Sequence, residues 1–359
     1  MAEMPQILGF ERAELAEFLE DLGEKRYRGD QIFRALHKRR ILEISEMTNL
    51  PKDLRKRLSE LATVRSLRLE ARFVSSDGTR RYLMKTADNK PVETVFIPTE
   101  KRDTICFSSQ SGCPLKCDFC LTARLGLLRN LTAAEIVEQI ALVLNDVYGT
   151  VADTPHGTNL VAMGEGEPFL NFENLLKAVS VLADEAGHFI VPNRITVSTA
   201  GVVPKIREFA ALSRRPNLAI SLSAATDELR NAIMPINRRW PLSALMAAAK
   251  EFESTLRRGE KFTFEYVLLG GVNDSSQQAI ELARLLRKHN LQKVKINLIP
   301  HNPAEQLPYR PSDPAAVTAF KAKLESYGIA AYVRRPRGRD IYAACGQLAA
   351  MHPIEALTN

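Results

Sequence analysis

Three of the chain's five cysteines lie within one short segment. Cys113, Cys117 and Cys120 have the spacing CxxxCxxC in SSQSGCPLKCDFC, residues 108–120. Soft thiolate ligands hold iron well, and three of them on a short loop can reach three corners of a cuboidal iron–sulfur cluster. The fourth iron would then be open to a ligand from outside the chain. The spacing therefore predicts one 4Fe-4S cluster.

A zinc ion is the alternative for these cysteines. Structural zinc prefers four ligands, commonly in CxxC pairs, and the sequence has no second pair. A distant histidine could still complete a Cys3His site, and the three thiols could also be incidental buried residues. On ligand number, the residues favour the cluster over both alternatives.

Cys106 and Cys345 lie outside the cluster segment. A thiol with a tunable pKa can act as a base and as a nucleophile, but most free cysteines are simply buried. Glu93 lies in the apolar run PVETVFIP, where a carboxylate is costly unless it is paired. It is therefore either functional or on the surface of an edge strand. The residues alone leave both questions open.

The surrounding pattern predicts the elements that position these residues. Helical spacing of apolar residues predicts helices over 15–22 and 31–42, and Pro51 marks the start of another over 49–61. Two β-type runs follow, at 81–86 and 92–98. From about residue 100 strands alternate with helices, and the strands are expected at 104–109, 158–163, 194–199, 218–223, 262–269 and 293–300.

This alternation predicts an α/β fold with a partial parallel (βα)6 barrel, since a complete barrel has eight units. The helix over 132–149 opens with a capping box from Thr132 to Glu135. In such barrels the C-terminal ends of the strands carry the active site. We therefore expect the polar segments that follow the strands to converge, namely GEGEP, STAG, SLSA, GGVND and NLIPHNP.

The charge and hydropathy of the chain limit the kinds of partner and the cellular compartment that we expect. The net charge is +7 and the pI about 9.1, with basic residues concentrated at 25–40 and 334–339. Either stretch can be a solvated face or a surface for a polyanion. The N-terminus lacks the pattern of a signal peptide, and no run approaches the ~20 apolar residues of a membrane span. We therefore expect a cytoplasmic protein that does not contact a membrane.

The cysteine motif directly after the first barrel strand resembles the radical S-adenosylmethionine (SAM) superfamily, in which SAM chelates the open iron. GEGEP (164–168) is similar to the superfamily's segment that contacts the SAM amino group. Over nearly the whole chain the sequence resembles the RlmN/Cfr family of RNA adenine methyltransferases. The resemblance rests on VETVFIP, CFSSQSGCPLKCDFC, GEPFLN, ITVSTAGVVP, MPINRRWP, EYVLLGGVNDS, INLIPHNP and DIYAACGQL. GEPFLN is closer to RlmN, the C2 enzyme, than to Cfr, the C8 enzyme.

The resemblance implies methylation of C2 of adenosine in 23S rRNA, and in tRNA next to the anticodon, with two SAM per turnover. Cys345 would carry the methyl group as S-methylcysteine. Cys106 would remove the C2 proton and help release the product, and Glu93 would act in acid–base chemistry or substrate positioning. A C8 methyltransferase of the Cfr type and a non-catalytic zinc-bound RNA-binding protein are the alternatives.

The resemblance also implies residues that bind SAM. They are Gly166, Glu167, Ser198, Ser221, Leu222, Ser223 and Asn297. The chain departs from the family pattern at two of the positions around SAM. Ser223 stands where the family usually has histidine, and Glu165 stands where it usually has methionine.

The resemblance implies that the chain is divided into four parts. Residues 1–70 would form a helical accessory domain that binds RNA, and 71–98 a β-rich connecting segment. Residues 99–345 would form the radical SAM core with the catalytic-cysteine loop, and 346–359 the C-terminal tail. An electron donor such as flavodoxin or ferredoxin is implied, and we expect a monomer. The predicted RNA contacts are Arg39, Arg40, Arg335 and Arg337.

Overall fold

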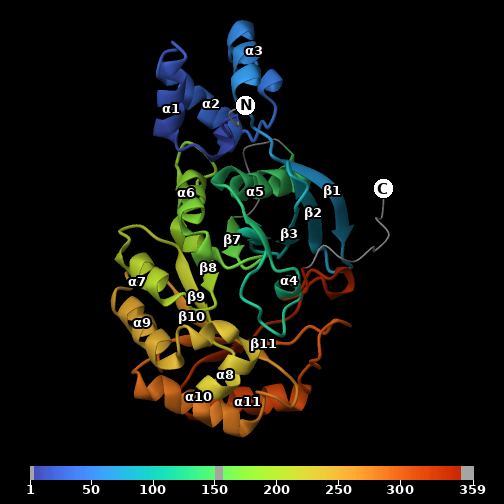
Figure 1. Cartoon of the computed structure of the whole chain (residues 1–359), viewed down its shortest axis with the longest axis vertical. Helices are drawn as coiled ribbons and strands as arrows, with labels where there is room; N and C mark the ends of the chain where they lie inside the picture. Colours follow the sequence, from blue (N-terminus) through green and yellow to red (C-terminus); the bar gives the residue numbers. More distant parts are fainter. Residues whose placement is uncertain (1–3, 150–156, 349–359) are drawn as a thin grey trace.

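The computed structural model describes residues 4–149 and 157–348, which are built around one ten-stranded sheet with the strand order β1-β2-β3-β4-β7-β8-β9-β10-β11-β12 (Figure 1). From β4 onward neighbouring strands are parallel, whereas β1, β2 and β3 extend the sheet in antiparallel fashion. The parallel strands are β4 (Asp103–Phe107), β7 (Thr158–Ala162), β8 (Ile195–Thr199), β9 (Asn217–Ser221), β10 (Phe262–Leu268), β11 (Lys295–Pro300) and β12 (Ala331–Val333).

The six predicted barrel strands are confirmed as β4 and β7 to β11. The sheet has an open order with β1 and β12 at its edges, as expected of a partial barrel. β12 was not predicted, because three residues are too short to produce a recognisable alternation. The antiparallel strands are β1 (Leu67–Val74), β2 (Arg80–Thr86) and β3 (Pro91–Ile97). The last two correspond to the two β-type runs.

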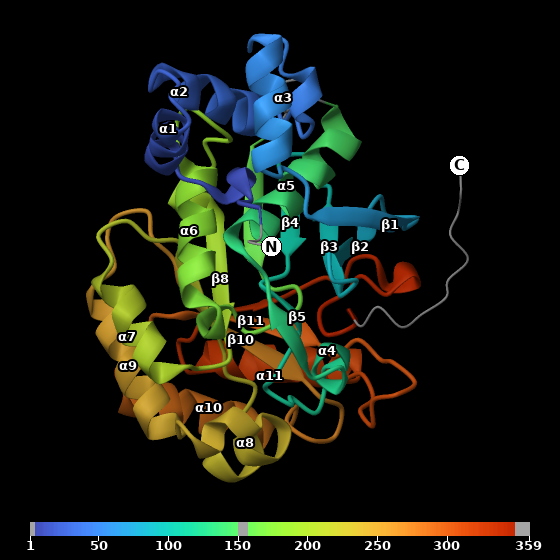
Figure 2. The ribbon, with the colours of Figure 1, turned by 45° about the horizontal axis from the view of Figure 1, so that its top comes forward.

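Helices follow the parallel strands and cover one face of the sheet (Figure 2). Side chains alternate between the faces of a strand, and β10 shows the result. Phe262, Phe264 and Tyr266 join the apolar core, whereas Thr263 and Glu265 point to the opposite, inner face. The helices are α5 (Ala133–Tyr148), α6 (Phe172–Ala183), α7 (Val203–Ala211), α8 (Asp227–Ile233), α9 (Leu242–Ser254), α10 (Ser276–Lys288) and α11 (Pro314–Ser326).

The N-terminal region is helical, as predicted, with α1 (Arg12–Asp21), α2 (Tyr27–Phe33) and α3 (Lys52–Leu61), and lies at one end of the molecule (Figure 1). A π-helical turn at Arg34–Lys38 ends the second predicted helix earlier than residue 42. β1 begins at Leu67, so the predicted boundary at residue 70 falls within a strand. Short 3-10 turns occur at Ile7–Gly9, Ile44–Glu46, Pro168–Leu170, Pro192–Arg194, Pro235–Arg238 and Arg339–Ile341.

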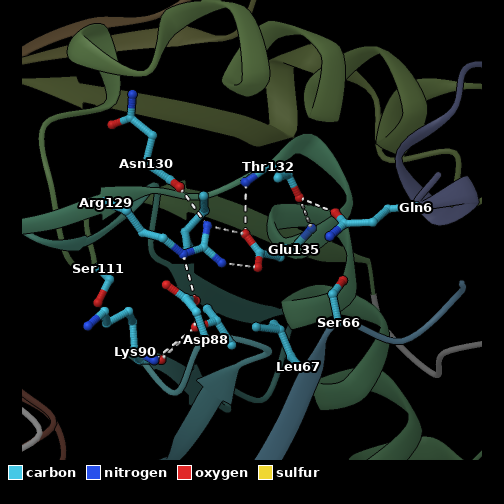
Figure 3. Close-up of polar contacts among 12 residues, drawn as sticks. Gln6, Ser66, Leu67, Asp88, Lys90, Ser111, Arg129, Asn130, Thr132 and Glu135 are labelled. Carbon is cyan, nitrogen blue, oxygen red and sulfur yellow. Dashed lines mark hydrogen bonds and ion pairs between the residues drawn. The ribbon is translucent and has the colours of Figure 1, made fainter. Parts of the chain in front are cut away.

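A two-stranded hairpin encloses the cysteine loop. It consists of β5 (Gln110–Gly112) and β6 (Leu127–Asn130), with the short helix α4 (Leu121–Arg124) between them. Figure 3 shows how Arg129 of β6 fastens the hairpin to its neighbours. Its guanidinium donates to Asp88 at 3.0 Å and forms a two-pronged pair with Glu135 of α5. The loop is therefore anchored at its base to both the sheet and a helix.

The start of α5 also joins the accessory region to the barrel. The predicted capping box is confirmed, because Thr132 and Glu135 bond each other's backbone N–H groups. The Thr132 hydroxyl donates to Gln6 at 2.6 Å. One turn further, the Glu138 carboxylate accepts from the backbone N–H groups of Ser66 and Leu67 at 2.8 and 3.0 Å. None of the helices in the described residues is long and apolar enough to cross a membrane.

Candidate active site

The inner face of the sheet gathers polar and sulfur-bearing side chains from successive strands. Cys106 of β4 lies in register with Val95 of β3 and Val161 of β7. Glu93 shares the face of Val95 because the two are two positions apart in the strand. Alternation along β4 sends the neighbours of Cys106, Ile105 and Phe107, into the apolar core. Residues far apart in the sequence therefore meet on one face.

Glu93 is fully buried and forms an ion pair with Arg81. Arg81 Nη1 donates to Glu93 Oε1 at 2.9 Å, and the two side chains are 3% and 0% exposed. Arg81 lies in register with Val95, so its guanidinium reaches Glu93 along a cross-strand diagonal. The guanidinium also lies 4.5 Å from the centre of the Phe73 ring. Glu93 is therefore not an exposed edge residue, and its charge is compensated.

The three clustered cysteines lie close enough to affect one another electrostatically. Burial is the main cause of the raised pKa of Cys113, to about 12, and it also raises the pKa values of Cys117 and Cys120. The mutual influence of the thiols raises the pKa of Cys117 further. Such thiols become thiolates when a cation binds them. Their chemistry fits a cationic iron cluster.

The described residues do not present a ready group of ligands for a single zinc ion. Among the described residues, no three His, Cys, Asp or Glu side chains are grouped to hold one metal ion. A zinc site needs its sulfurs within one coordination sphere, whereas a cuboidal cluster places each sulfur on a different iron. Cys113, Cys117 and Cys120 would thus hold a cluster, with each thiolate at one corner.

The C-terminal segment carries Cys345 to the cluster loop. The Leu121 N–H donates to the Gly346 carbonyl at 2.9 Å, and the Thr122 hydroxyl donates to the Leu348 carbonyl at 2.6 Å. Cys345 is exposed to solvent. The tail predicted at 346–359 lies outside the described residues from 349 onward.

The two isolated cysteines face the same region. Burial is the main cause that raises the pKa of Cys106, and the charge of Cys345 is the second. Ile341, Ala343 and Leu348 of the C-terminal segment pack in one apolar cluster with Cys106. The structure therefore brings Cys106 and Cys345 together, beside the cysteine loop, although one lies on the first barrel strand and the other follows the last strand of the sheet.

The predicted SAM-binding residues on the barrel strands occupy the same inner face. Ser221 of β9 lies in register with Glu265 of β10, which in turn lies in register with Asn297 of β11. Asn297 Nδ2 donates to Glu265 Oε1 at 2.7 Å. The bond to the Glu265 carboxylate thereby orients the Asn297 amide, so that the amide oxygen can accept from a ligand. Ser198, which is half-buried on β8, lies in register with Ala219, two residues before Ser221.

The GEGEP segment (164–168) follows β7 and is held by Gln110 of β5, whose Oε1 accepts from the Glu167 N–H at 2.8 Å. Gly166 has a φ of +94°, and a Cβ there would lie 2.5 Å from the Gln110 side chain, so only glycine fits. The Glu167 carboxylate accepts from the N–H groups of Phe169 at 3.0 Å and Ala200 at 2.7 Å. Burial raises the pKa of Glu167 to about 7 despite these bonds.

The remaining predicted SAM residues are partly committed to the fold. The Leu222 side chain lies in the apolar core, so only its backbone can face a cofactor. Ser223 is buried with a φ of +54°, and its hydroxyl accepts from the Val267 N–H at 3.3 Å. The serine that replaces the family's histidine therefore bonds the backbone of β10.

Sequence reasoning missed three buried charged residues at this site, namely Arg81, Glu265 and Arg230. Arg230 is fully buried, and its guanidinium donates to the carbonyls of Ala200, Ser221 and Leu222. It thus ties together the ends of β8 and β9. A signal existed for Glu265, since a lone carboxylate interrupts the apolar run FTFEYVLL. Nothing in the sequence distinguishes Arg81 from Arg80.

The predicted RNA contacts divide into exposed and buried residues. Arg39, Arg335 and Arg337 are exposed. Arg40 is only 3% exposed, so its prediction as an RNA contact is wrong. Its guanidinium donates to Asn145 Oδ1 at 3.0 Å and to the Gly149 carbonyl at 2.7 Å. The residue secures the accessory region to α5, because these partners lie at the C-terminal end of that helix.

Comparison with known proteins agrees with this geometry. Residues 107–283 match the Radical SAM superfamily, and residues 5–64 match the ribosomal RNA large subunit methyltransferase N-terminal domain. The fold is similar to the crystal structure of a radical SAM methyltransferase from Sphaerobacter thermophilus, with a TM-score of 0.90, 40% identity, and coverage of 96% of this chain and 99% of that one. The chain is a radical SAM protein, and the superfamily implies SAM and a 4Fe-4S cluster as cofactors.

Two proteins of similar sequence identify the family within this superfamily. The chain is 47% identical to the probable dual-specificity RNA methyltransferase RlmN of Koribacter versatilis, over 92% of this chain and 97% of that protein. It is 45% identical to the dual-specificity RNA methyltransferase RlmN of Geobacter sulfurreducens, over 97% and 93%. The chain belongs to the RlmN family.

Proposed function

We propose that this protein methylates C2 of adenosine in 23S rRNA, and in tRNA next to the anticodon, through an S-methylcysteine on Cys345. The proposal rests on the proximity of Cys345 to Cys106 beside the loop of Cys113, Cys117 and Cys120: the charge of Cys345 raises the pKa of Cys106, and the C-terminal segment packs against both Cys106 and the loop. The relatives named above are dual-specificity RNA methyltransferases, which supports two RNA substrates.

The target carbon explains why five cysteines are needed. C2 of adenine lies between two ring nitrogens and is electron-poor, so it does not attack the methyl group of SAM. When bound, the cluster and SAM supply the one-electron chemistry that breaks a C–H bond of a methyl group. Cys113, Cys117 and Cys120 would hold the cluster, while Gly166, Glu167, Ser198, Ser221, Leu222, Ser223 and Asn297 would orient SAM.

Cys345 and Cys106 would perform complementary steps. The Cys345 sulfur accepts a methyl group from one SAM by displacement and presents it to C2, and a second SAM is used in each turnover. Cys106 would remove the C2 proton. Its sulfur would then displace the methylene carbon from the Cys345 sulfur, so that the S–S bond forms as the S–C bond breaks and the released carbon takes up a proton. The reductant of the reaction would restore the two thiols. Exposure of Cys345 suits a residue that must meet both SAM and RNA, and burial of Cys106 suits a base shielded from water. Glu93, held by Arg81, would position the base.

One experiment tests this function. The anaerobically reconstituted protein is incubated with SAM, a reductant, and either a 23S rRNA fragment or tRNA, and the nucleosides are analysed by mass spectrometry. We expect 2-methyladenosine from both RNAs and none from Cys345→Ala. Formation of 8-methyladenosine would replace the proposal with the C8 reaction. Absence of any methylated adenosine, in a protein that binds its cluster and SAM, would contradict it.

We further propose that flavodoxin or ferredoxin supplies the electrons, and that the protein acts as a cytoplasmic monomer. Either electron carrier, with its reductase, should replace the chemical reductant in the same assay. Light scattering should give a mass near 40.1 kDa for the protein alone. A dimer mass, or failure of both carriers, would contradict the respective statement.

A further inference from the structure

Glu165 carries a buried carboxyl group whose oxygens have no hydrogen-bond partner among the described residues. The residue is 1% exposed. Glu167, two positions along, is as deeply buried, but each of its oxygens accepts a backbone N–H. Leaving a buried polar group without a partner is strongly unfavourable. The Glu165 carboxyl is therefore a group that a ligand would satisfy.

The backbone of Glu165 keeps this carboxyl in place. The Glu165 N–H donates to the Ser108 hydroxyl at 2.9 Å, and its carbonyl accepts from the N–H groups of Ser109 and Gln110 at 3.0 and 3.3 Å. These bonds join the end of β7 to the end of β4. They therefore fix the position of the Glu165 backbone.

Charged neighbours locate the carboxyl within the site. Its pKa is raised well above the usual range, first by burial and then by the charge of Glu93. The backbone N–H groups of Glu93 and Gly112 and the Arg81 charge favour the ionised form, but none of them reaches hydrogen-bond geometry with it. Arg81 is already engaged with Glu93 at 2.9 Å. The Arg81 guanidinium thus faces the carboxyl groups of Glu93 and Glu165 and bonds that of Glu93.

The position of Glu165 along the sheet bears on whether its carboxyl faces SAM or the RNA base. Glu165 interacts with residues of β2 and β3, and the strand that it follows, β7, lies beside Cys106 on β4. The predicted SAM residues Ser198, Ser221 and Asn297 lie further along, on β8, β9 and β11. Gly166 and Glu167, which directly follow Glu165, are also predicted to bind SAM. The carboxyl is therefore between the predicted SAM residues and the strand of Cys106, which would remove the proton from the target base.

We propose that the Glu165 carboxyl accepts a hydrogen bond from the 6-amino group of the target adenine, and so contributes to selection of that base. This inference rests on the proposed function. Enzymes that modify a base read its Watson–Crick edge after removing it from the stack, and the amino group is the donor on that edge of adenine. A carboxyl oxygen accepts this bond whether or not the group is protonated. The methionine usual in the family at this position offers only a weak acceptor.

The test pairs two RNAs with three proteins. The RNAs are a stem-loop with adenosine at the target position and the same stem-loop with purine riboside, which lacks the 6-amino group. The proteins are the wild type, Glu165→Met and Glu165→Gln, each reconstituted with its cluster and held with S-adenosylhomocysteine to prevent turnover. RNA affinity is measured by fluorescence anisotropy. Phosphate contacts are common to both RNAs, so the ratio of the two affinities isolates the amino group.

We expect the wild type to bind the adenosine RNA about tenfold more tightly than the purine RNA, which is the upper end of the effect of one hydrogen bond between neutral groups. Glu165→Met should reduce this ratio to about one, and Glu165→Gln, which keeps an acceptor oxygen, should retain part of it. Glu165→Met should also raise the unfolding temperature of the RNA-free protein, because it removes an unsatisfied buried group. Glu138→Gln is the matched control: it alters a buried glutamate outside the site and should leave the ratio unchanged.

An affinity ratio that is the same in the wild type and Glu165→Met overturns the inference. A loss of SAM affinity in Glu165→Met with an unchanged RNA ratio also overturns it, and assigns the carboxyl to SAM instead. Neither result depends on methylation. Failure of the proposed function is seen separately, as absence of 2-methyladenosine from the wild type.

Discussion

Asn302 bonds the backbone of Cys345: its Nδ2 donates to the Cys345 carbonyl oxygen at 3.2 Å. Its Oδ1 accepts from Arg339 Nε at 2.9 Å, so the amide bridges two points of the C-terminal segment. Asn302 is itself buried in the loop that follows β11. The proposed methyl carrier is thus positioned by a barrel loop, although it belongs to a segment outside the sheet.

Asn302→Asp should misplace Cys345 while preserving the bond to Arg339. The carboxylate that this substitution introduces accepts from Arg339 but cannot donate to the Cys345 carbonyl. We expect methyl transfer to RNA to fall at least about tenfold, because small displacements of a reacting group have large kinetic effects. SAM affinity should not change. Wild-type rates of S-methylation of Cys345 and of RNA methylation in this variant would contradict the positioning role.

Replacement of Cys106 and replacement of Cys345 should impair the reaction at different steps. Cys106→Ala removes the proposed base and the partner that releases the product, so a covalent protein–RNA adduct should accumulate. Cys345→Ala should give neither adduct nor product, since it cannot carry the methyl group, yet it should still bind the cluster. Denaturing gels of the reaction with labelled RNA distinguish these outcomes. Normal turnover of Cys106→Ala without adduct would show that its assignment is wrong.

Glu138 should make the stability of the protein fall with rising pH. Burial raises the pKa of its carboxyl from 4.5 to about 7, against the bonds from Ser66 and Leu67 and the charge of Arg65. The folded protein therefore holds this proton more tightly than the unfolded chain does. The contribution is fully present below about pH 4.5 and is lost as the pH rises through about 7. Its upper limit is about 3 kcal/mol.

Glu138→Gln tests this contribution because the amide oxygen can still accept from Ser66 and Leu67. Urea unfolding at about pH 5 and about pH 8, on either side of the raised pKa, should show a smaller decrease in stability for the variant than for the wild type. Equal decreases in the two proteins would remove Glu138 as a source of the pH dependence.

Replacement of the neighbouring residues Arg39 and Arg40 should affect different properties, RNA binding for Arg39 and stability for Arg40. Arg39 is exposed and bonds Asn49 at 3.0 Å, so Arg39→Ala should reduce the slope of log affinity against log salt by about one if the residue contacts a phosphate. Arg40→Ala should leave the slope unchanged and lower the unfolding temperature, because buried bonds to Asn145 and Gly149 are lost. The two slopes, measured side by side, check both statements.

Local patterns were sufficient for much of this protein. The alternation of strand and helix predicted six barrel strands, and the spacing of Cys113, Cys117 and Cys120 predicted a cluster loop, because both depend on residues close together in the chain. The capping box at Thr132 and Glu135 is equally local. Family resemblance extended the prediction to Cys106 and Cys345, whose separation in sequence gives no hint that they meet.

Only the tertiary structure decided which charges are buried and what faces them. Arg39 and Arg40 are adjacent in a basic stretch, yet one is exposed and the other is enclosed by the end of α5. Arg81 and Glu93 pair through the register of β2 and β3, whereas the Glu165 carboxyl has no hydrogen-bond partner among the described residues. The order of the elements and the thiol chemistry of the cluster loop could be predicted from the sequence. Burial and charge pairing depend on which distant strands lie in register, and the folded sheet alone sets that register.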